Sequence, residues 1–164
     1  MRCMEPIRYD PIGIIHSPFR DPMGTPIQPT AAEGIIGVVE VFPPFTRGLK
    51  DLDGFSHVVL LYHFHRAGAV ALEVTPFLDD ESHGVFATRA PSRPNAIGMS
   101  VVRLLGTEGG NLQVEDLDVL DGTPLLDIKP YVPQFDARRK TRIGWLKRRS
   151  RPIRSTRDDG RFGR

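Results

Sequence analysis

The sequence predicts a mostly β fold, in the form of a small closed or nearly closed β-barrel of about seven strands with short helices. Short runs of β-branched and apolar residues recur at close spacing along the 164 residues of the chain. The 16 glycines and 15 prolines are typical of many short strands joined by turns. Windows with helical periodicity are scarce, and no G-x-G-x-x-G motif follows an expected strand. A barrel therefore fits better than a Rossmann fold.

The expected elements can be placed in chain order. Ile12 to His16 and Ile35 to Val41 are the first two strands, and prolines follow the second. A short helix is expected over Thr46 to Leu52. The strongest strand runs from His57 to His65, because apolar residues occupy both of its faces, as in a buried strand. Four more strands are expected over Leu72 to Phe77, Gly84 to Thr88, Met99 to Leu105 and Leu112 to Leu117.

The charges divide the chain into an acidic body and a basic tail. Residues 1–136 contain 10 lysines and arginines against 18 aspartates and glutamates, whereas residues 137–164 contain 12 against 2. We therefore expect one barrel domain over 1–136 and a basic C-terminal tail over 137–164 whose last part is disordered. Because Ile143, Trp145 and Leu146 interrupt the basic residues, the tail favours a nucleic-acid partner over a merely solvated terminus.

The composition also bears on location. The chain has one cysteine, Cys3, and therefore no internal disulfide. No apolar run approaches the roughly 18 residues that a membrane span needs. We expect a cytoplasmic protein without membrane contact.

Residues 84–98 form the segment most suggestive of a binding loop. An apolar run leads into a turn that holds two arginines, Arg89 and Arg93, and two prolines, Pro91 and Pro94. The prolines restrict the backbone, so the two guanidinium groups are displayed on a stiff turn. From this segment alone, a binding loop and a plain surface turn fit equally well.

Two other segments carry more polar groups than simple connections need. Asp121-Gly122-Thr123-Pro124 forms a tight turn, and Asp118 and Asp127 crowd with Asp121 near Lys129 and Tyr131. Gln28-Pro29-Thr30 lies in a long Pro-rich loop from Pro18 to Glu33, whose length suggests a lid or binding loop. These features by themselves indicate a ligand-binding β domain.

The histidines offer one metal hypothesis. His57, His63 and His65 share strand parity, so all three could point to one face. His63 and His65 form a His-x-His pair, a possible pair of metal ligands, but the pair lacks an obvious third ligand. The chain also lacks the cysteine pairs of a zinc ribbon and the G-x-x-x-x-G-K-[ST] motif of a P-loop. We expect no metal site.

Four motifs stand in order along residues 10–136. They are I-G-I-I-H-S-P-F at 12–19, G-L-K-D-L-D-G-F-S-H at 48–57, R-P-N-A-I-G at 93–98 and L-D-G-T-P-L-L-D-I-K-P-Y at 120–131. Together with the Ala-Thr-Arg run at 87–89 they resemble the TrmO / TsaA-like family. One departure is Ala96, where the family pattern usually has a second proline.

The resemblance implies a small β-barrel methyltransferase that uses S-adenosyl-L-methionine and works as a homodimer, with cofactor sites near the subunit interface. It implies as substrate the exocyclic nitrogen of threonylcarbamoyladenosine beside the anticodon of tRNA. Carried over by position, the cofactor contacts fall on Gln28, Pro29, Thr30, His65, Arg66, Arg89, Met99, Asp121, Gly122, Thr123 and Pro124.

Roles in the reaction follow from its chemistry. Methyl transfer to a carbamoylated amine is helped by removal of the amine's proton, for which Asp121 is the first candidate and Tyr131 the second. Asp121 could equally hold the cofactor's ammonium or ribose, or simply cap its turn. Substrate contacts are predicted for Arg93, Asn95 and Lys129, and a guanidinium such as that of Arg93 can grip a carboxylate or a phosphate.

Three alternatives remain at this stage. The first is a non-catalytic RNA-binding barrel whose tail supplies affinity and whose loops stack bases. The second keeps the cofactor but changes the acceptor. The third, weaker one is a metal-dependent hydrolase that uses the three histidines.

Overall fold

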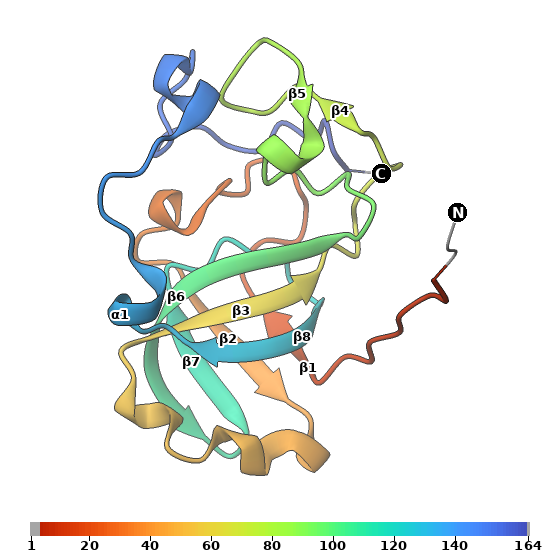
Figure 1. The fold of residues 1–164 in the computed structure, drawn as a ribbon. Coiled ribbons are helices and arrows are strands. Elements are labelled where there is room, and N and C mark those ends of the chain that lie inside the picture. Colours follow the sequence, from red (N-terminus) through yellow and green to blue (C-terminus); the bar gives the residue numbers. More distant parts are fainter. Residues whose placement is uncertain (1–3, 164) are drawn as a thin grey trace.

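The computed structural model describes residues 4–163 and contains a closed six-stranded barrel (Figure 1). All strand pairs are antiparallel, in the order β1-β2-β7-β6-β3-β8. The barrel strands are β1 (Gly13–His16), β2 (Ile36–Val41), β3 (His57–His63), β6 (Ile97–Glu108), β7 (Asn111–Glu115) and β8 (Thr123–Pro130). The predicted fold class is confirmed, with six barrel strands in place of about seven.

Short elements connect and cover the barrel. A separate two-stranded sheet is formed by β4 (Glu73–Val74) and β5 (His83–Gly84). The helical segments are η1 (Pro29–Ala31), η2 (Pro43–Leu49), η3 (Leu52–Gly54), η4 (Val85–Ala87), α1 (Pro133–Asp136) and η5 (Gly144–Arg148). Among residues 4–163, no helix is long and apolar enough to cross a membrane.

The barrel interior is filled by alternate residues of its strands. In β3, Val58, Leu60 and Tyr62 are buried, whereas the residues between them are only half-buried. This period of two places one face of each strand in the core and the other outside. The other barrel strands add to this core, among others, Ile15, Val39, Val102, Leu112, Val114 and Leu125.

The prediction of a strand over Gly84 to Thr88 is wrong. Only His83–Gly84 pairs as β5, and the chain then turns through η4, where the Thr88 hydroxyl donates to the Val85 carbonyl at 2.9 Å. Val85 is buried, but the Phe86 side chain is 76% exposed. The apolar run therefore supplies one core residue and one surface residue, and it does not form a buried strand.

Strand β8 was missed, because its first residues were assigned only to a tight turn. Pro124 and Pro130 lie close to the two ends of β8, and prolines are tolerated at strand ends more readily than in the middle. The central strand also ends earlier than expected, at His63, and His65 lies in the turn that follows. His57 and His63 therefore share strand parity in β3, whereas His65 lies outside the strand.

Three segments gather above one end of the barrel, as Figure 1 shows. They are the loop between β1 and β2, the long connection between β3 and β6, and the C-terminal segment, which the figure draws in dark blue. A small second core of Val74, Val85, Ala90 and Phe162 joins the last two. We call these three segments the cap.

The C-terminal segment folds back onto the other two segments of the cap. After α1 the chain runs along the barrel to η5, where Trp145 Nε1 donates to the Ala87 carbonyl at 2.8 Å. Bridges pair Pro26 with Arg157 and Ala67 with Gly163, and the Phe162 side chain is only 8% exposed. Apolar side chains among the charges of this segment thus find a core to enter. A domain boundary at residue 136 stays a prediction.

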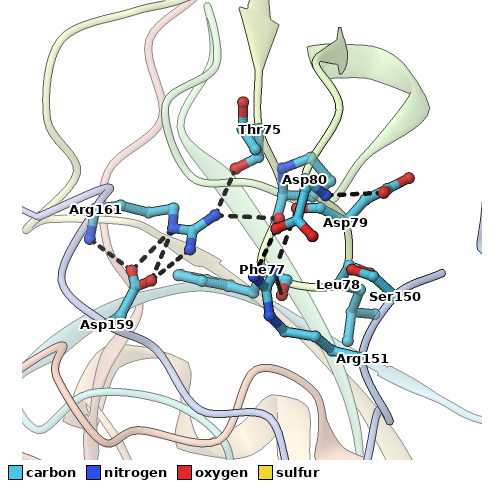
Figure 2. A network of polar contacts seen from close by, with 10 residues as sticks. Thr75, Phe77, Leu78, Asp79, Asp80, Ser150, Arg151, Asp159 and Arg161 are labelled. Carbon is cyan, nitrogen blue, oxygen red and sulfur yellow. Dashed lines mark hydrogen bonds and ion pairs between the residues drawn. The ribbon is translucent and has the colours of Figure 1, made fainter.

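Two arginines of this segment bind the connection between β3 and β6 (Figure 2). Arg151 pairs with Asp80 at 2.5 Å and donates to the Phe77 carbonyl at 3.1 Å. Arg161 pairs with Asp159, donates to the Thr75 carbonyl at 3.2 Å and lies over the Phe77 ring. These two cations therefore hold the tail in place.

Candidate functional site

A cavity of about 970 Å³ lies between the barrel end and the cap. Its walls come from the loop between β1 and β2, the ends of β3 and β6 that face the cap, the turn after η4, the chain before β8 and the C-terminal segment. The lining is mostly apolar, with a few polar groups, and its size is that of a typical small-molecule site. The cavity is therefore the candidate functional site.

The cavity brings together most of the predicted cofactor contacts and one predicted substrate contact. The predicted residues in its lining are Gln28, Pro29, Thr30, His65, Arg66, Arg89, Arg93, Met99 and Thr123. Asp121, Gly122, Pro124, Asn95, Lys129 and Tyr131 are outside the lining. Their assignment to the site stays a prediction.

Arg89 and Arg93 have different roles in the turn after η4. Arg89 reaches across the cavity wall and donates to Gln28 Oε1 at 3.0 Å. Arg93 instead donates to the carbonyls of Thr88 and Ala90, at 3.1 and 3.0 Å. Arg93 therefore fixes the shape of its own loop, while Arg89 joins two walls of the cavity and presents its charge there.

His65 lies at the base of the cap, beside the start of β8. Its Nδ1 is 3.2 Å from the Thr123 hydroxyl, which itself donates to the Leu120 carbonyl. Since the hydroxyl hydrogen is used there, Nδ1 donates and Nε2 keeps a free lone pair. Burial lowers the pKa of His65, and the charges of Arg66 and His63 lower it further. His65 is thus a neutral hydrogen-bonding group.

Arg66 is placed to anchor the loop between β1 and β2. Its guanidinium donates to the Arg20 carbonyl at 3.4 Å and lies 3.8 Å from the Asp21 carboxylate. Both contacts are exposed and therefore weak. They nevertheless connect the end of β3 with the loop that carries Gln28.

A chain of three polar side chains enters the cavity wall from the barrel interior. Ser100 Oγ donates to Asp118 Oδ1 at 2.5 Å, and Tyr62 Oη lies 2.9 Å from the same Ser100 oxygen. Burial raises the pKa of Asp118 to about 6. Burial also raises the pKa of Tyr62, and the Asp118 charge adds to that shift. Asp118 and Tyr62 both line the cavity.

In the sequence, Asp118 stands out only as one member of an acidic group. The available signal was its position among Leu117, Val119 and Leu120, where a lone carboxylate interrupts an apolar run. Ser100 gave a similar signal inside the apolar strand β6. The sequence does not reveal that β6 and the segment before β8 bring these two side chains together.

Asp121 has a structural partner outside the cavity lining. Its carboxylate accepts from the Ser17 backbone N–H at 3.1 Å, and His16 Nδ1 lies 3.8 Å away. Its own N–H donates to the Phe19 carbonyl at 2.7 Å. Asp121 thereby fastens the chain after β1 to the turn before β8.

Tyr131 lies at the opposite end of β3 from His65. Its N–H donates to the His57 carbonyl at 3.1 Å, and its ring meets the His57 ring edge-on. His57 begins β3, whereas the cavity surrounds the residues after the end of that strand. Lys129, near the end of β8, pairs with Asp127 at 2.7 Å.

The three histidines do not form a metal site with other ligands in residues 4–163. Within residues 4–163, no three His, Cys, Asp or Glu side chains gather as a metal site would require. His57 contacts Ser56, and His65 contacts Thr123. The hydrolase alternative therefore has no structural support in the described part of the chain.

Comparison with protein families identifies the barrel. Residues 14–137 match the model of the tRNA-methyltransferase O N-terminal domain. A probable S-adenosyl-L-methionine-binding protein of Pyrococcus abyssi is 60% identical over 156 residues, which cover 95% of this chain and 85% of that protein. The tRNA (adenine(37)-N6)-methyltransferase of Mus musculus is 38% identical over 148 residues, covering 82% of this chain and 34% of the mouse protein.

Solved structures agree with this match. TrmO from Pseudomonas aeruginosa superposes with a TM-score of 0.72 at 45% sequence identity, over 85% of this chain and 62% of that one. The chain thus spans about three fifths of that structure's length, although it spans most of the Pyrococcus relative. The fold, the family model and the identities agree, and the chain belongs to the family of the tRNA-methyltransferase O N-terminal domain.

Proposed function

We propose that this protein is an S-adenosyl-L-methionine-dependent methyltransferase that modifies the exocyclic nitrogen of threonylcarbamoyladenosine beside the anticodon of tRNA. The observation that carries the proposal is the cavity, which collects nine predicted contact residues from distant segments in a chain of this family. The names of the Pyrococcus and mouse relatives support the cofactor and the tRNA adenine, respectively.

The cavity residues fit the cofactor chemically. Apolar walls from Phe64, Ile97 and Met99 suit an adenine ring and a methionine chain, and Arg89 suits a carboxylate. Gln28 and His65 offer hydrogen bonds of defined direction. When bound, S-adenosyl-L-methionine supplies an electrophilic methyl group. The work left to the protein is to align the acceptor nitrogen with that methyl and to exclude water.

The acceptor contacts are part of the same proposal. Arg93, Asn95 and Lys129 remain the predicted contacts to threonylcarbamoyladenosine or to a neighbouring phosphate. Arg93 lines the cavity and is already bound to two carbonyls of its loop. Arg93 would therefore assist substrate binding in two ways. It holds the loop in position, and it places a positive charge near the cavity.

The proposal includes a homodimer in the cytoplasm, where tRNA is found. Phe86, Ile97 and Met99 are exposed apolar residues that also line the cavity. Apolar side chains beside a site are the kind of surface that a second subunit covers. Light scattering of the purified protein would check this part, because a monomer at micromolar concentration would contradict it.

Two measurements test the proposed function. Calorimetry should show binding of S-adenosyl-L-methionine, and Arg89→Ala should weaken it by about tenfold or more because a charged contact is lost. The matched control is Arg47→Ala, which changes an exposed arginine of η2 outside the cavity lining and should leave binding unchanged. No binding by the wild-type protein at millimolar ligand would instead favour the non-catalytic RNA-binding barrel.

The substrate is tested with tRNA that contains threonylcarbamoyladenosine. Incubation with the protein and the methyl donor, followed by digestion and mass spectrometry, should show one added methyl group on that nucleoside. Methylation of a different nucleoside would keep the enzyme but change the acceptor.

A further inference from the structure

Asp118 is an acidic side chain in the cavity lining that the cofactor contacts leave without a role. It stands between the buried residues Leu117 and Val119, in the segment before β8. Among the described residues, Ser100 is the only side chain that hydrogen-bonds its carboxylate. A carboxylate kept in an apolar setting costs free energy, so a cavity that retains one invites a functional explanation.

The hydrogen bonds around Asp118 have a defined direction. The Ser100 hydroxyl gives its hydrogen to Asp118, so its oxygen must accept from the Tyr62 hydroxyl. Both hydroxyl hydrogens therefore point toward Asp118, which is the order expected when the carboxylate is ionised. Tyr62 and Ser100 are buried in the barrel, in β3 and β6, so Asp118 is held by side chains of the barrel core.

Burial is the largest influence on the Asp118 carboxylate, and it disfavours the charged form. Hydrogen bonds from Ser100 and from the backbone favour the charged form, and the positive charge of Arg89, on the turn after η4, adds a smaller favourable effect. With a pKa of about 6, the carboxylate is mostly ionised at pH 7 and binds a proton more strongly than an ordinary aspartate. A general base is most effective when its pKa lies near the working pH.

Given the proposed function, we propose that Asp118 is the catalytic base that accepts the proton of the acceptor nitrogen, with Ser100 and Tyr62 as positioning residues. The nitrogen lone pair forms the new N–C bond while the methyl C–S bond breaks and leaves its electron pair on sulfur. The N–H electron pair remains on nitrogen, and its proton passes to the Asp118 carboxylate.

Asp118 suits this role better than Asp121. Asp118 lines the cavity, whereas the Asp121 carboxylate is held by the Ser17 N–H outside the lining. A competing role for Asp118 is an ion pair with the cofactor's ammonium group. The two roles differ in what they predict for binding and for pH dependence, so an experiment can separate them.

The test uses the full chain and Asp118→Asn. We expect the turnover rate on modified tRNA to fall by about a hundredfold or more, while calorimetry gives a dissociation constant for S-adenosyl-L-methionine within about twofold of the wild type. The control Asp51→Asn, at an exposed left-handed position outside the cavity lining, should change neither quantity. A rise in the dissociation constant that accounts for the lost activity would overturn the base and favour the ammonium partner.

Ser100→Ala provides the second variant, because it keeps the carboxylate and removes one donor to it. Its acidic limb in the pH–rate profile should move to higher pH than in the wild type, because the lost hydrogen bond had favoured the charged carboxylate. Carboxyl carbon NMR of the cofactor-free protein should show the same shift for Asp118, a readout that needs no turnover. An unmoved acidic limb and an unmoved NMR titration would reject Asp118 as the base positioned by Ser100, even if Asp118→Asn proved unfolded.

The outcomes also separate this inference from the proposed function. A wild-type protein that neither binds the donor nor methylates tRNA would overturn both. A wild-type protein that methylates tRNA, together with an equally active Asp118→Asn variant, would overturn only the role of Asp118.

Discussion

The indole of Trp145 stacks on the imidazole of His83, with ring centroids 4.6 Å apart and an interplanar angle of 15°. His83 also lies 3.0 Å from the Asp79 carboxylate, whose pKa is lowered chiefly by that hydrogen bond. The stack joins the basic tail to β5, in the cap that forms one side of the cavity. A segment with the composition of a solvated terminus is thus part of the candidate site.

Trp145→Ala should weaken donor binding, because it removes both the stack and a cavity-lining side chain. Aromatic pairs contribute about 0.5–1.5 kcal/mol beyond their buried area, which corresponds to a loss of about twofold to tenfold. Calorimetry with S-adenosyl-L-methionine measures the effect. Trp145→Phe is the matched variant and should bind nearly as well as the wild type, since it keeps a ring and loses only the N–H bond to Ala87.

Removal of residues 137–164 should weaken donor binding and also weaken tRNA binding. The first effect follows because Trp145, Leu146, Ile153 and Phe162 leave the cavity lining. The second follows because twelve basic residues leave with them. Unchanged donor affinity in the truncated protein would show that the tail is not part of the site.

The exposed tail cations can be tested apart from the tail's packing. Arg139, Lys140 and Arg142 are exposed and lie outside the cavity lining. Their combined replacement by glutamine should reduce the slope of log K for tRNA against log salt by about two to three, because each phosphate contact contributes about 0.7–0.9. Donor binding should not change. Equal salt slopes for the two proteins would exclude these residues from the RNA interface.

Gly98→Ala should destabilise the barrel at the cavity. A methyl group at this position would overlap the ring of Tyr62, which is buried and held by Ser100. Overpacking of this kind costs about 1–3 kcal/mol in the free energy of unfolding, and chemical denaturation measures it. Gly48→Ala, where the new methyl group meets open space, is the control and should cost less than Gly98→Ala.

The raised pKa of Asp118 should make stability depend on pH. The folded protein holds the Asp118 proton up to about pH 6, whereas an unfolded chain releases it near the ordinary aspartate pKa of 3.8. Between these values the folded state binds more protons, so the contribution of this group to stability falls as pH rises. The melting temperature of the wild type relative to Asp118→Asn should therefore decrease from pH 4 to pH 7. A constant difference would contradict the raised pKa.

The barrel and much of the site were predictable because their signals are local or are carried by motifs. Short runs of β-branched and apolar residues indicated β2, β3, β6 and β7. Gln28, His65 and Arg89 were predicted from motifs and line one cavity. The region 84–88 and strand β8 were misread, because short apolar runs and prolines do not reveal which backbone groups will find partners.

The sequence by itself determined the class of fold, the division of charge between body and tail, and the residue types available to bind a methyl donor. Tertiary structure decided which of those residues meet. In the fold, Asp121 binds the backbone of Ser17, and Tyr131 lies beside His57, at the end of β3 far from the cavity. Asp118 meets Ser100, which is 18 positions away in the chain. The physical reason is that strand period and composition are local properties. Barrel closure and burial of Trp145 and Phe162 instead depend on contacts between segments that are distant in sequence.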